Sequence, residues 1–242
     1  MVYAREYGGE TLTFGVSGKL YANSLIMYDH QTGSLWSHLT GEAITGAKRG
    51  TRLRVLPAMQ TTWKLWRALH PETLVIAKSR SPYLRDYSRD PYEGYYYSSR
   101  TGVIPPLRRD QRLNPKEYII GVRIAGKAKA YPFSLLNTHP VINDSFQGTP
   151  LLVVFSRESA TGMVFRRTLA GKVLTFSLAG EGKGEVILLR DAETGSLWSG
   201  LTGTAQQGPL QGKSLIPLPL TYAFWFGWKD FYPDTVIWEA PR

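Results

Sequence analysis

Apolar residues separated by Gly, Ser and single polar residues recur along this chain in short stretches, and this pattern predicts β-strands. The clearest stretches are rich in β-branched and aromatic residues: 11–20 (TLTFGVSGKL), 24–30 (SLIMYDH), 173–180 (VLTFSLAG) and 186–192 (VILLRDA). The block 118–162 predicts a hairpin (119–132), a short helix (132–137) and two more strands (140–146 and 150–155). The pattern therefore favours a turn-rich, mainly β fold.

Two segments have helical spacing instead. In residues 61–73 (TTWKLWRALHPET), Trp63, Trp66 and Leu69 fall on one helical face, Thr61 or Thr62 can cap the start, and Pro71 closes the helix. Residues 222–235 (YAFWFGWKDFYPDT) repeat this spacing with Trp225, Trp228 and Phe231. An apolar stretch follows each helix, and we expect a last strand at 74–77 (LVIA) and at 236–239 (VIWE).

The chain also contains a long internal repeat. Residues 32–41 read TGSLWSHLTG and residues 194–203 read TGSLWSGLTG; a shift of 162 aligns residues 1–76 with 163–238 without a gap. About forty residues from near Tyr118 onward precede the second copy and have no counterpart before the first. We therefore predict a β-rich α+β fold of two tandem antiparallel units, each ending in a short Trp-containing helix, the first incomplete at its N-terminus.

This prediction also sets the domain organisation. We expect an incomplete first repeat (1–77), a Tyr/Arg-rich connecting strap (78–117) and a complete second repeat (118–242), together forming one compact pseudo-symmetric domain. A chain of this length can bury a sizeable core as one or two domains.

The repeated string is interpreted as scaffold. In both copies an Asp begins a D-x-x-T-G turn, because Asp accepts hydrogen bonds from backbone N–H groups two or three residues on and Gly tolerates positive φ. A Trp then follows on the next strand. The predicted structural motif comprises Asp29, Gly33 and Trp36 in the first copy and Asp191, Gly195 and Trp198 in the second.

Catalytic or binding residues are better sought at aligned positions of the two copies where the residue types differ. His38 and Glu42 of the first copy are aligned with Gly200 and Thr204 of the second. An imidazole with a carboxylate can share a proton or bind a metal. His38 and Glu42 are the candidate catalytic residues; the alternative is that they are two surface polar residues in a loop. Candidate ligand-binding residues are Gln60, Arg85, Tyr87, His139 and Asn143. No metal or other cofactor is assigned.

Charge and composition narrow the partners. The net charge is +10, and basic residues alternate with tyrosines in 78–116, a combination that can bind single-stranded nucleic acid. Without a nucleic-acid module signature we favour a surface strap instead. The chain has no cysteine and no apolar stretch long enough to span a membrane as a helix.

Long stretches of this chain resemble the prokaryotic family known as domain of unknown function 3179 (DUF3179). They are 14–46, 56–73, 85–95 and 121–155, so the resemblance covers almost the entire chain. It implies an extracytoplasmic protein; otherwise the location would be cytoplasmic. Members commonly carry a Cys-Pro-x-Cys stretch; the corresponding residues here, 156–159, read SRES, which indicates a truncated or degenerate member that lacks the cysteine pair.

The leading hypothesis is a binding or structural module with a ligand groove between the repeats, taking a small molecule or a protein. The alternative is a metal-assisted or acid/base hydrolase that uses His38 and Glu42. Because an incomplete first repeat leaves strand edges unpaired, a homodimer is a further hypothesis.

Overall fold

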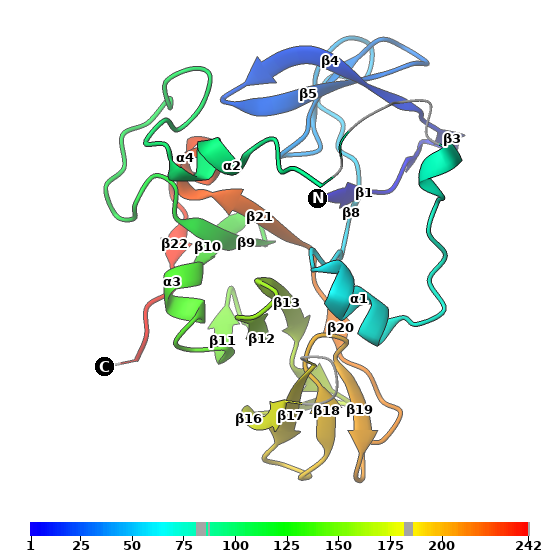
Figure 1. Ribbon diagram of the computed structural model, residues 1–242, viewed down its shortest axis with the longest axis vertical. Helices are drawn as coiled ribbons and strands as arrows, with labels where there is room; N and C mark the ends of the chain where they lie inside the picture. Colours follow the sequence, from blue (N-terminus) through cyan, green and yellow to red (C-terminus); the bar gives the residue numbers. More distant parts are fainter. Residues whose placement is uncertain (81–85, 87, 182–185, 242) are drawn as a thin grey trace.

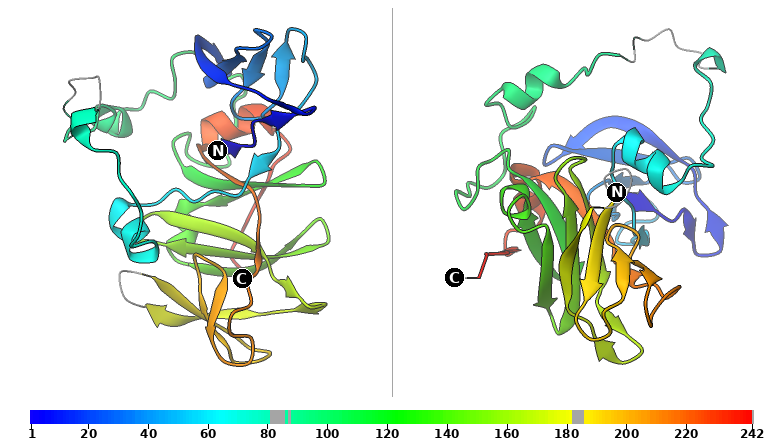
Figure 2. Two further views of the ribbon diagram at one scale, coloured as in Figure 1. Left: turned by 90° about the vertical axis from the view of Figure 1, so that its right-hand side faces the viewer. Right: turned by 60° about the horizontal axis from the view of Figure 1, so that its bottom comes forward.

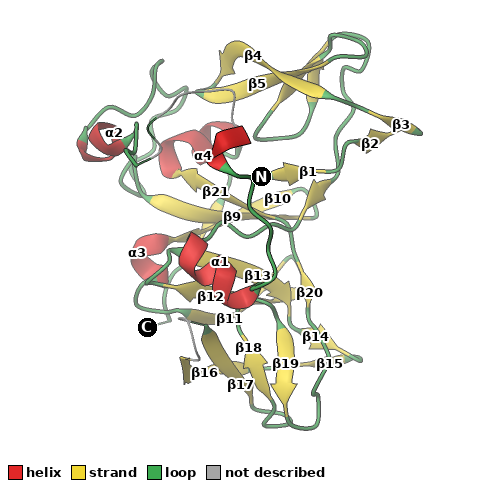
Figure 3. Ribbon diagram, turned by 45° about the vertical axis from the view of Figure 1, so that its right-hand side comes forward, coloured by secondary structure: helices red, strands yellow, loops and turns green. Residues whose placement is uncertain are grey.

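The computed structural model describes residues 1–80, 86, 88–181 and 186–241. Its elements are mostly antiparallel strands, with a few short helices, so the predicted mainly β fold is confirmed. Figure 3 shows the sheets stacked along the long axis of the molecule, with the N-terminal strands at one end and the β16–β19 sheet at the other. Among the described residues, no helix has the length and apolar content needed to cross a membrane.

The N-terminal part contains three small sheets. β1 (Val2–Tyr3) pairs with β8 (Val55–Leu56), and β2 (Glu6–Tyr7) pairs with β3 (Glu10–Thr11). The third sheet has the order β4-β5-β6-β7, formed by β4 (Phe14–Tyr21), β5 (Ser24–Asp29), β6 (Leu35–Ser37) and β7 (Ala43–Thr45). Helix α1 (Trp63–Leu69) follows; the Thr62 side chain accepts a hydrogen bond from the Leu65 N–H and caps its first turn.

The C-terminal part contains larger sheets. β9 (Tyr118–Ile124), β10 (Lys127–Pro132), β21 (Leu220–Phe224) and β22 (Val236–Ile237) form a sheet in the order β21-β9-β10-β22. A second sheet, β11-β12-β13-β20, consists of β11 (Val141–Phe146), β12 (Thr149–Ser156), β13 (Thr161–Arg166) and β20 (Ile216–Pro217). β14 (Thr168–Leu169) pairs with β15 (Lys172–Val173). β16 (Phe176–Glu181), β17 (Ile187–Asp191), β18 (Leu197–Ser199) and β19 (Thr204–Gln207) form the last sheet. Two helices complete this part: α3 (Phe133–Leu136) and α4 (Trp225–Phe231).

Helix α1 packs on the C-terminal part, and α4, whose tryptophans pack on β9 and β10 of its own part, also reaches the N-terminal part. Leu65 of α1 is fully buried in the large core of the C-terminal sheets. Phe231 of α4 contacts the ring of Tyr21 on β4, with 5.5 Å between ring centroids. Each part therefore holds the other in place, and the surface between them is built from both.

The strap between them lies at the periphery (Figure 2). It contains a 3₁₀ turn (Lys78–Arg80) and helix α2 (Glu93–Tyr97), which the sequence did not predict. The Asn23 side chain, at the β4–β5 turn, hydrogen-bonds to both the N–H and the C=O of Ile104. The Asp230 carboxylate accepts the N–H groups of Leu107 and Arg108. Side chains of both parts thus fasten the strap through its backbone.

Equivalent contacts recur at the 162-residue spacing of the sequence repeat. Strand pairing Tyr3↔Val55 matches Phe165↔Pro217, and the isolated bridge Glu42↔Arg52 matches Thr204↔Ser214. Helices α1 and α4 each span seven residues at matched positions. That the two segments are copies of one unit within a single domain stays a prediction of the sequence, with these matched contacts in its favour.

One expected element is missing. Residues 74–77 form no strand, although their matched residues contain β22. The reason is pairing: β22 is held by β10, with Lys129 opposite Val236 and Ala130 opposite Ile237. Among the described residues no strand pairs with 74–77, and an isolated extended segment cannot satisfy the hydrogen bonds that define a strand.

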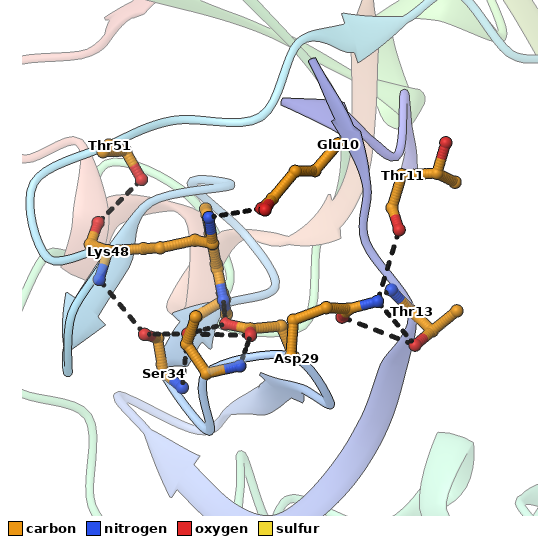
Figure 4. A network of polar contacts seen from close by, with 10 residues as sticks. Glu10, Thr11, Thr13, Asp29, Ser34, Lys48 and Thr51 are labelled. Atoms are coloured by element: carbon orange, nitrogen blue, oxygen red, sulfur yellow. Dashed lines mark hydrogen bonds and ion pairs between the residues drawn. The ribbon is translucent and has the colours of Figure 1, made fainter. Parts of the chain in front are cut away.

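A buried carboxylate organises the turn in each part. Asp29 is fully buried; its Oδ1 accepts the Thr32 N–H at 2.6 Å and its Oδ2 accepts the Trp36 indole N–H at 2.8 Å. The Thr32 hydroxyl also bonds to the carboxylate and to Ser34, whose hydroxyl accepts the Lys48 N–H (Figure 4). Gly33 takes φ +67°, which closes the turn.

The second part has the same arrangement at Asp191. Thr194 N–H and Trp198 indole N–H donate to its carboxylate at 2.6 and 2.8 Å, and Gly195 takes φ +73°. The two indoles, once oriented, meet a phenylalanine edge to face, Phe14 in one part and Phe176 in the other. The hydrogen bond from the indole to the carboxylate therefore links each turn to the core of its own part.

We predict that these carboxylates make the fold sensitive to acid. Burial by itself raises the pKa of Asp29 and of Asp191, but hydrogen bonds from the Trp and Thr partners outweigh it and hold both pKa values below the ordinary 3.8. A depressed pKa contributes stability above the unfolded-state pKa, and this contribution is lost as the pH falls from there through the folded-state pKa. Urea unfolding between pH 7 and 2 should show this loss.

Asp191→Asn should reduce the free energy of unfolding at pH 7 by about 2 kcal/mol, the scale of a hydrogen bond to a charged group. It should also flatten the pH dependence below pH 4. Asp234→Asn removes the same charge at an exposed site and is the control. An equal loss in both variants would contradict the assignment.

Candidate binding cleft

A cleft lies where the β6–β7 region of the N-terminal part meets β9 and the end of α4. It comprises two adjoining hollows, of about 320 and 290 Å³, which share Thr40, Arg123 and Tyr232. Both volumes are at the lower end of the range for small-molecule sites. Residues from the N-terminal and C-terminal parts line both hollows, so the cleft exists only in the assembled fold.

Arg123 points into the cleft because of strand alternation. On β9, Val122 is buried in the large core, and the next residue faces the other way. The guanidinium carbon of Arg123 lies 5.1 Å from the centroid of the Tyr232 ring, and that ring lies 4.3 Å from the Trp228 ring. Among the described residues no carboxylate ion-pairs with Arg123. The cleft therefore contains an oriented cation without a counter-ion.

The other charged residues at the cleft are already paired. Glu42 Oε2 lies 2.5 Å from Arg52 Nη2. Asp230 pairs with Lys229 at 3.2 Å and accepts the two strap N–H groups. The carboxylates thus leave the charge of Arg123 uncompensated, and the local balance favours an anion.

Two tyrosines near Arg123 are neutral hydrogen-bonding groups. Burial raises the pKa of Tyr3, and the neighbouring Tyr232 raises it further, against the opposing charge of Arg123. Burial also raises the pKa of Tyr232, although Arg123 and Arg52 favour its charged form. The Tyr3 hydroxyl donates to the His38 carbonyl at 2.6 Å. Neither phenol ionises near neutral pH, so neither cancels the arginine charge.

His38, the residue that differs within the repeated string, has a packing explanation. Its N–H bonds to the Leu25 carbonyl, as the Gly200 N–H bonds to that of Ile187. A Cβ at Gly200 would lie 3.0 Å from Val154 Cγ1 and 3.1 Å from Ile187 Cγ2. Val154 belongs to β12, which lies in the block that has no counterpart in the N-terminal part, and there is therefore room for a side chain at position 38.

The structure does not join His38 to Glu42. None of the contacts of the described residues links the imidazole to that carboxylate, which is held by Arg52 instead. Burial lowers the pKa of His38, with a second contribution from the N-terminal ammonium. The described residues contain no group of three or more His, Cys, Asp or Glu arranged to hold a metal ion. The acid/base pair stays a prediction of the sequence, and of the two residues Glu42 lines the cleft.

The remaining predicted ligand-binding residues lie apart. Gln60 is exposed, and its backbone hydrogen-bonds to the Tyr222 phenol. The His139 ring contacts Trp238, and Asn143 bonds to both backbone groups of Phe176, which ties β11 to β16. None of the three lines the two hollows. Arg85 and Tyr87 lie outside the described residues.

The main cleft residues were missed by the sequence analysis. Arg123 lies in the block without a matched copy, so no comparison of equivalent positions could single it out. Tyr232 is matched to His70 by the shift of 162, so the sequence did show a difference between the two copies at this position. What neither pattern reveals is that β9 and the end of α4 meet Thr40 of the N-terminal part.

Comparison with known proteins gives one result for this chain. A family model described as protein of unknown function (DUF3179) matches residues 1–235. No curated protein and no solved structure matches. The comparisons therefore supply a family and no activity.

We predict an asymmetry between positions 200 and 38. Gly200→His must push against Val154 and Ile187 and should cost about 1–3 kcal/mol of unfolding free energy, the usual cost of overpacking. His38→Ala removes a half-buried side chain that fills no such gap and should cost less than about 1 kcal/mol. Urea denaturation of both variants tests this, and comparable losses would contradict the packing explanation.

Proposed function

The chain belongs to the DUF3179 family of proteins of unknown function, and we propose that this member is a binding module that holds a small anionic organic molecule in the cleft between its two parts. The observation that carries the proposal is Arg123, which lines both hollows with its guanidinium carbon 5.1 Å from the Tyr232 ring centroid and has no carboxylate partner among the described residues.

Arginine suits this role for physical reasons. Its planar guanidinium donates two parallel hydrogen bonds to a carboxylate or phosphate, and stacking on an aromatic ring fixes its plane. The attraction between the guanidinium and the Tyr232 ring favours one position of the donor before a ligand arrives, which lowers the entropy cost of binding. The hydroxyls of Thr40 and Thr221 lie in the same hollow and offer further polar contacts.

The rest of the first hollow indicates the body of the ligand. Leu39, Val55 and Leu220 give it an apolar wall. A compact carboxylate or phosphate ester with a short apolar portion matches this combination of one cationic group and aliphatic surface. The volume of about 320 Å³ limits the ligand to a small molecule.

The proposal includes an extracytoplasmic location, which rests on the family resemblance alone. A module that binds small anions outside the cytoplasm needs no catalytic group in the cleft. The paired state of Glu42 with Arg52 agrees with a binding role, because a carboxylate held in an ion pair is a poor general base.

We predict that Arg123→Ala weakens anion binding. A panel of small carboxylates and phosphate esters is screened against the purified protein by ligand-observed NMR, and Kd values are measured for the compounds that bind. Arg123→Ala should weaken binding at least tenfold, the effect of losing one charge-assisted interaction of about 1.5 kcal/mol. Arg123→Lys keeps the charge but loses the stacked fork, and its affinity should be intermediate.

Arg5→Ala is the matched control, because Arg5 is exposed and its side chain makes no hydrogen bond, ion pair or ring contact among the described residues. The proposal fails if no compound of the panel binds, or if the binders keep their affinity in Arg123→Ala while the variant melts at the wild-type temperature. Equal weakening by Arg5→Ala would indicate general attraction to a basic protein.

A further inference from the structure

The segment after α1 exposes three consecutive apolar residues. Leu74, Val75 and Ile76 are 96, 68 and 85% exposed and belong to no strand. Figure 1 shows this segment leaving α1 with no strand alongside it. Apolar residues exposed in a row are unusual in a folded protein, and such patches mark interaction surfaces.

The matched segment in the C-terminal part shows how such residues are covered. Val236 and Ile237 form β22, which pairs in parallel with β10, and the Trp238 N–H donates to the Ala130 carbonyl at 2.8 Å. These residues are displaced by 162 positions from Leu74, Val75 and Ile76. The C-terminal segment therefore has a partner strand, whereas none of the described strands pairs with residues 74–76.

The residues that connect each helix to the following apolar segment have the same conformation in both parts. The Trp66 indole N–H donates to Thr73 Oγ1 at 2.9 Å, and the Trp228 indole N–H donates to Thr235 Oγ1 at 3.0 Å. The residue that ends each helix has nearly equal backbone angles, φ −135° and ψ 72° at His70 against −130° and 70° at Tyr232. The segment after α1 and the segment after α4 thus leave their helices in the same direction relative to each helix.

The helix faces differ in the same way as the strands. Trp225 and Trp228 of α4 are fully buried against β9 and β10. The backbone of Gly121 makes room for the Trp228 ring, since a Cβ there would lie 2.4 Å from Trp228 Cη2. On α1, the equivalent Trp63 is 49% exposed. The uncovered tryptophan and the uncovered segment 74–76 correspond to the surface that the β9–β10 hairpin covers in the C-terminal part.

We propose that Trp63, Trp66 and residues 74–76 form a docking surface for a β-hairpin of the β9–β10 type, contributed by a partner polypeptide. One strand of that hairpin pairs in parallel with residues 74–76, which is strand addition to an exposed segment. Small residues on the hairpin, in the positions of Gly121 and Ala130, accept the tryptophan rings. The proposal is independent of the anion site, because the cleft does not include these residues.

A second copy of this chain does not fit this role. In the order β21-β9-β10-β22, both strands of the hairpin already have a neighbour on each side. A second copy could supply its hairpin only by releasing its own β22. The occupant is therefore a hairpin with a free edge.

The test appends residues 117–162 as an extra block ahead of Met1, which repeats the connection from Gly162 to Met163 and raises the effective concentration of the hairpin. Hydrogen exchange is then measured at residues 74–76 in the chain with and without the block. We expect at least tenfold protection and a blue shift of tryptophan fluorescence with the block. A block in which Gly121 is replaced by Val is the matched control, since it obstructs the ring, and should give neither effect.

Register provides a second readout, because the chain has no cysteine. Val75→Cys matches Ile237, so it should form a disulfide with Ala130→Cys of the appended block faster than with Ala128→Cys. Since the block could disturb folding, exchange is also measured with a stapled peptide of residues 118–132 added to the unmodified protein. Absence of protection in both formats overturns the proposal. Protection that instead rises with the concentration of the unmodified protein alone assigns the surface to a second copy and also overturns it.

Discussion

The hydrogen bond from a buried indole to a buried aspartate is the interaction on which the rest of this structure depends. Asp29 and Asp191 are both fully buried. A buried carboxylate is costly unless its lone pairs are used, and here the donors come from the same turn and the following strand. Because the carboxylate needs these donors, the turn must close and the indole must point inward. The turn and the core of each part are therefore fixed together.

With both turns fixed alike, the differences between the two parts come from what packs around them. The C-terminal part has β9 to β12, and their side chains decide which residues fit nearby. A Cβ at Gly200 would lie 3.0 Å from Val154 Cγ1. A Cβ at Gly121 would lie 2.4 Å from the Trp228 ring. No residue of the N-terminal part is matched to Val154 or Gly121, which agrees with the side chain at His38 and the exposed Trp63.

This contrast explains how far the sequence could be interpreted. The strands, the Thr62 cap and the turn at Asp29 follow from local rules, because each depends on residues within a few positions of one another. The strand predicted at 74–77 is wrong although its residues suit a strand, because no described strand pairs with it. Only the strand pairing of the structure reveals this. Arg123 and Tyr232 come together through strand order and helix placement, which no local pattern encodes.

The cleft and the exposed apolar segment lie on two different sides of the N-terminal part. Because α4 lies against β4 while β9 passes beside Thr40, the C-terminal elements close one side of the N-terminal part and leave Arg123 at the seam. On the other side, Leu65 of α1 inserts into the large core, and Trp63 stays 49% exposed. The N-terminal part contributes a wall to a polar cleft on one side and keeps an apolar surface on the other, so the proposed anion site and the proposed docking surface use separate residues of the same unit.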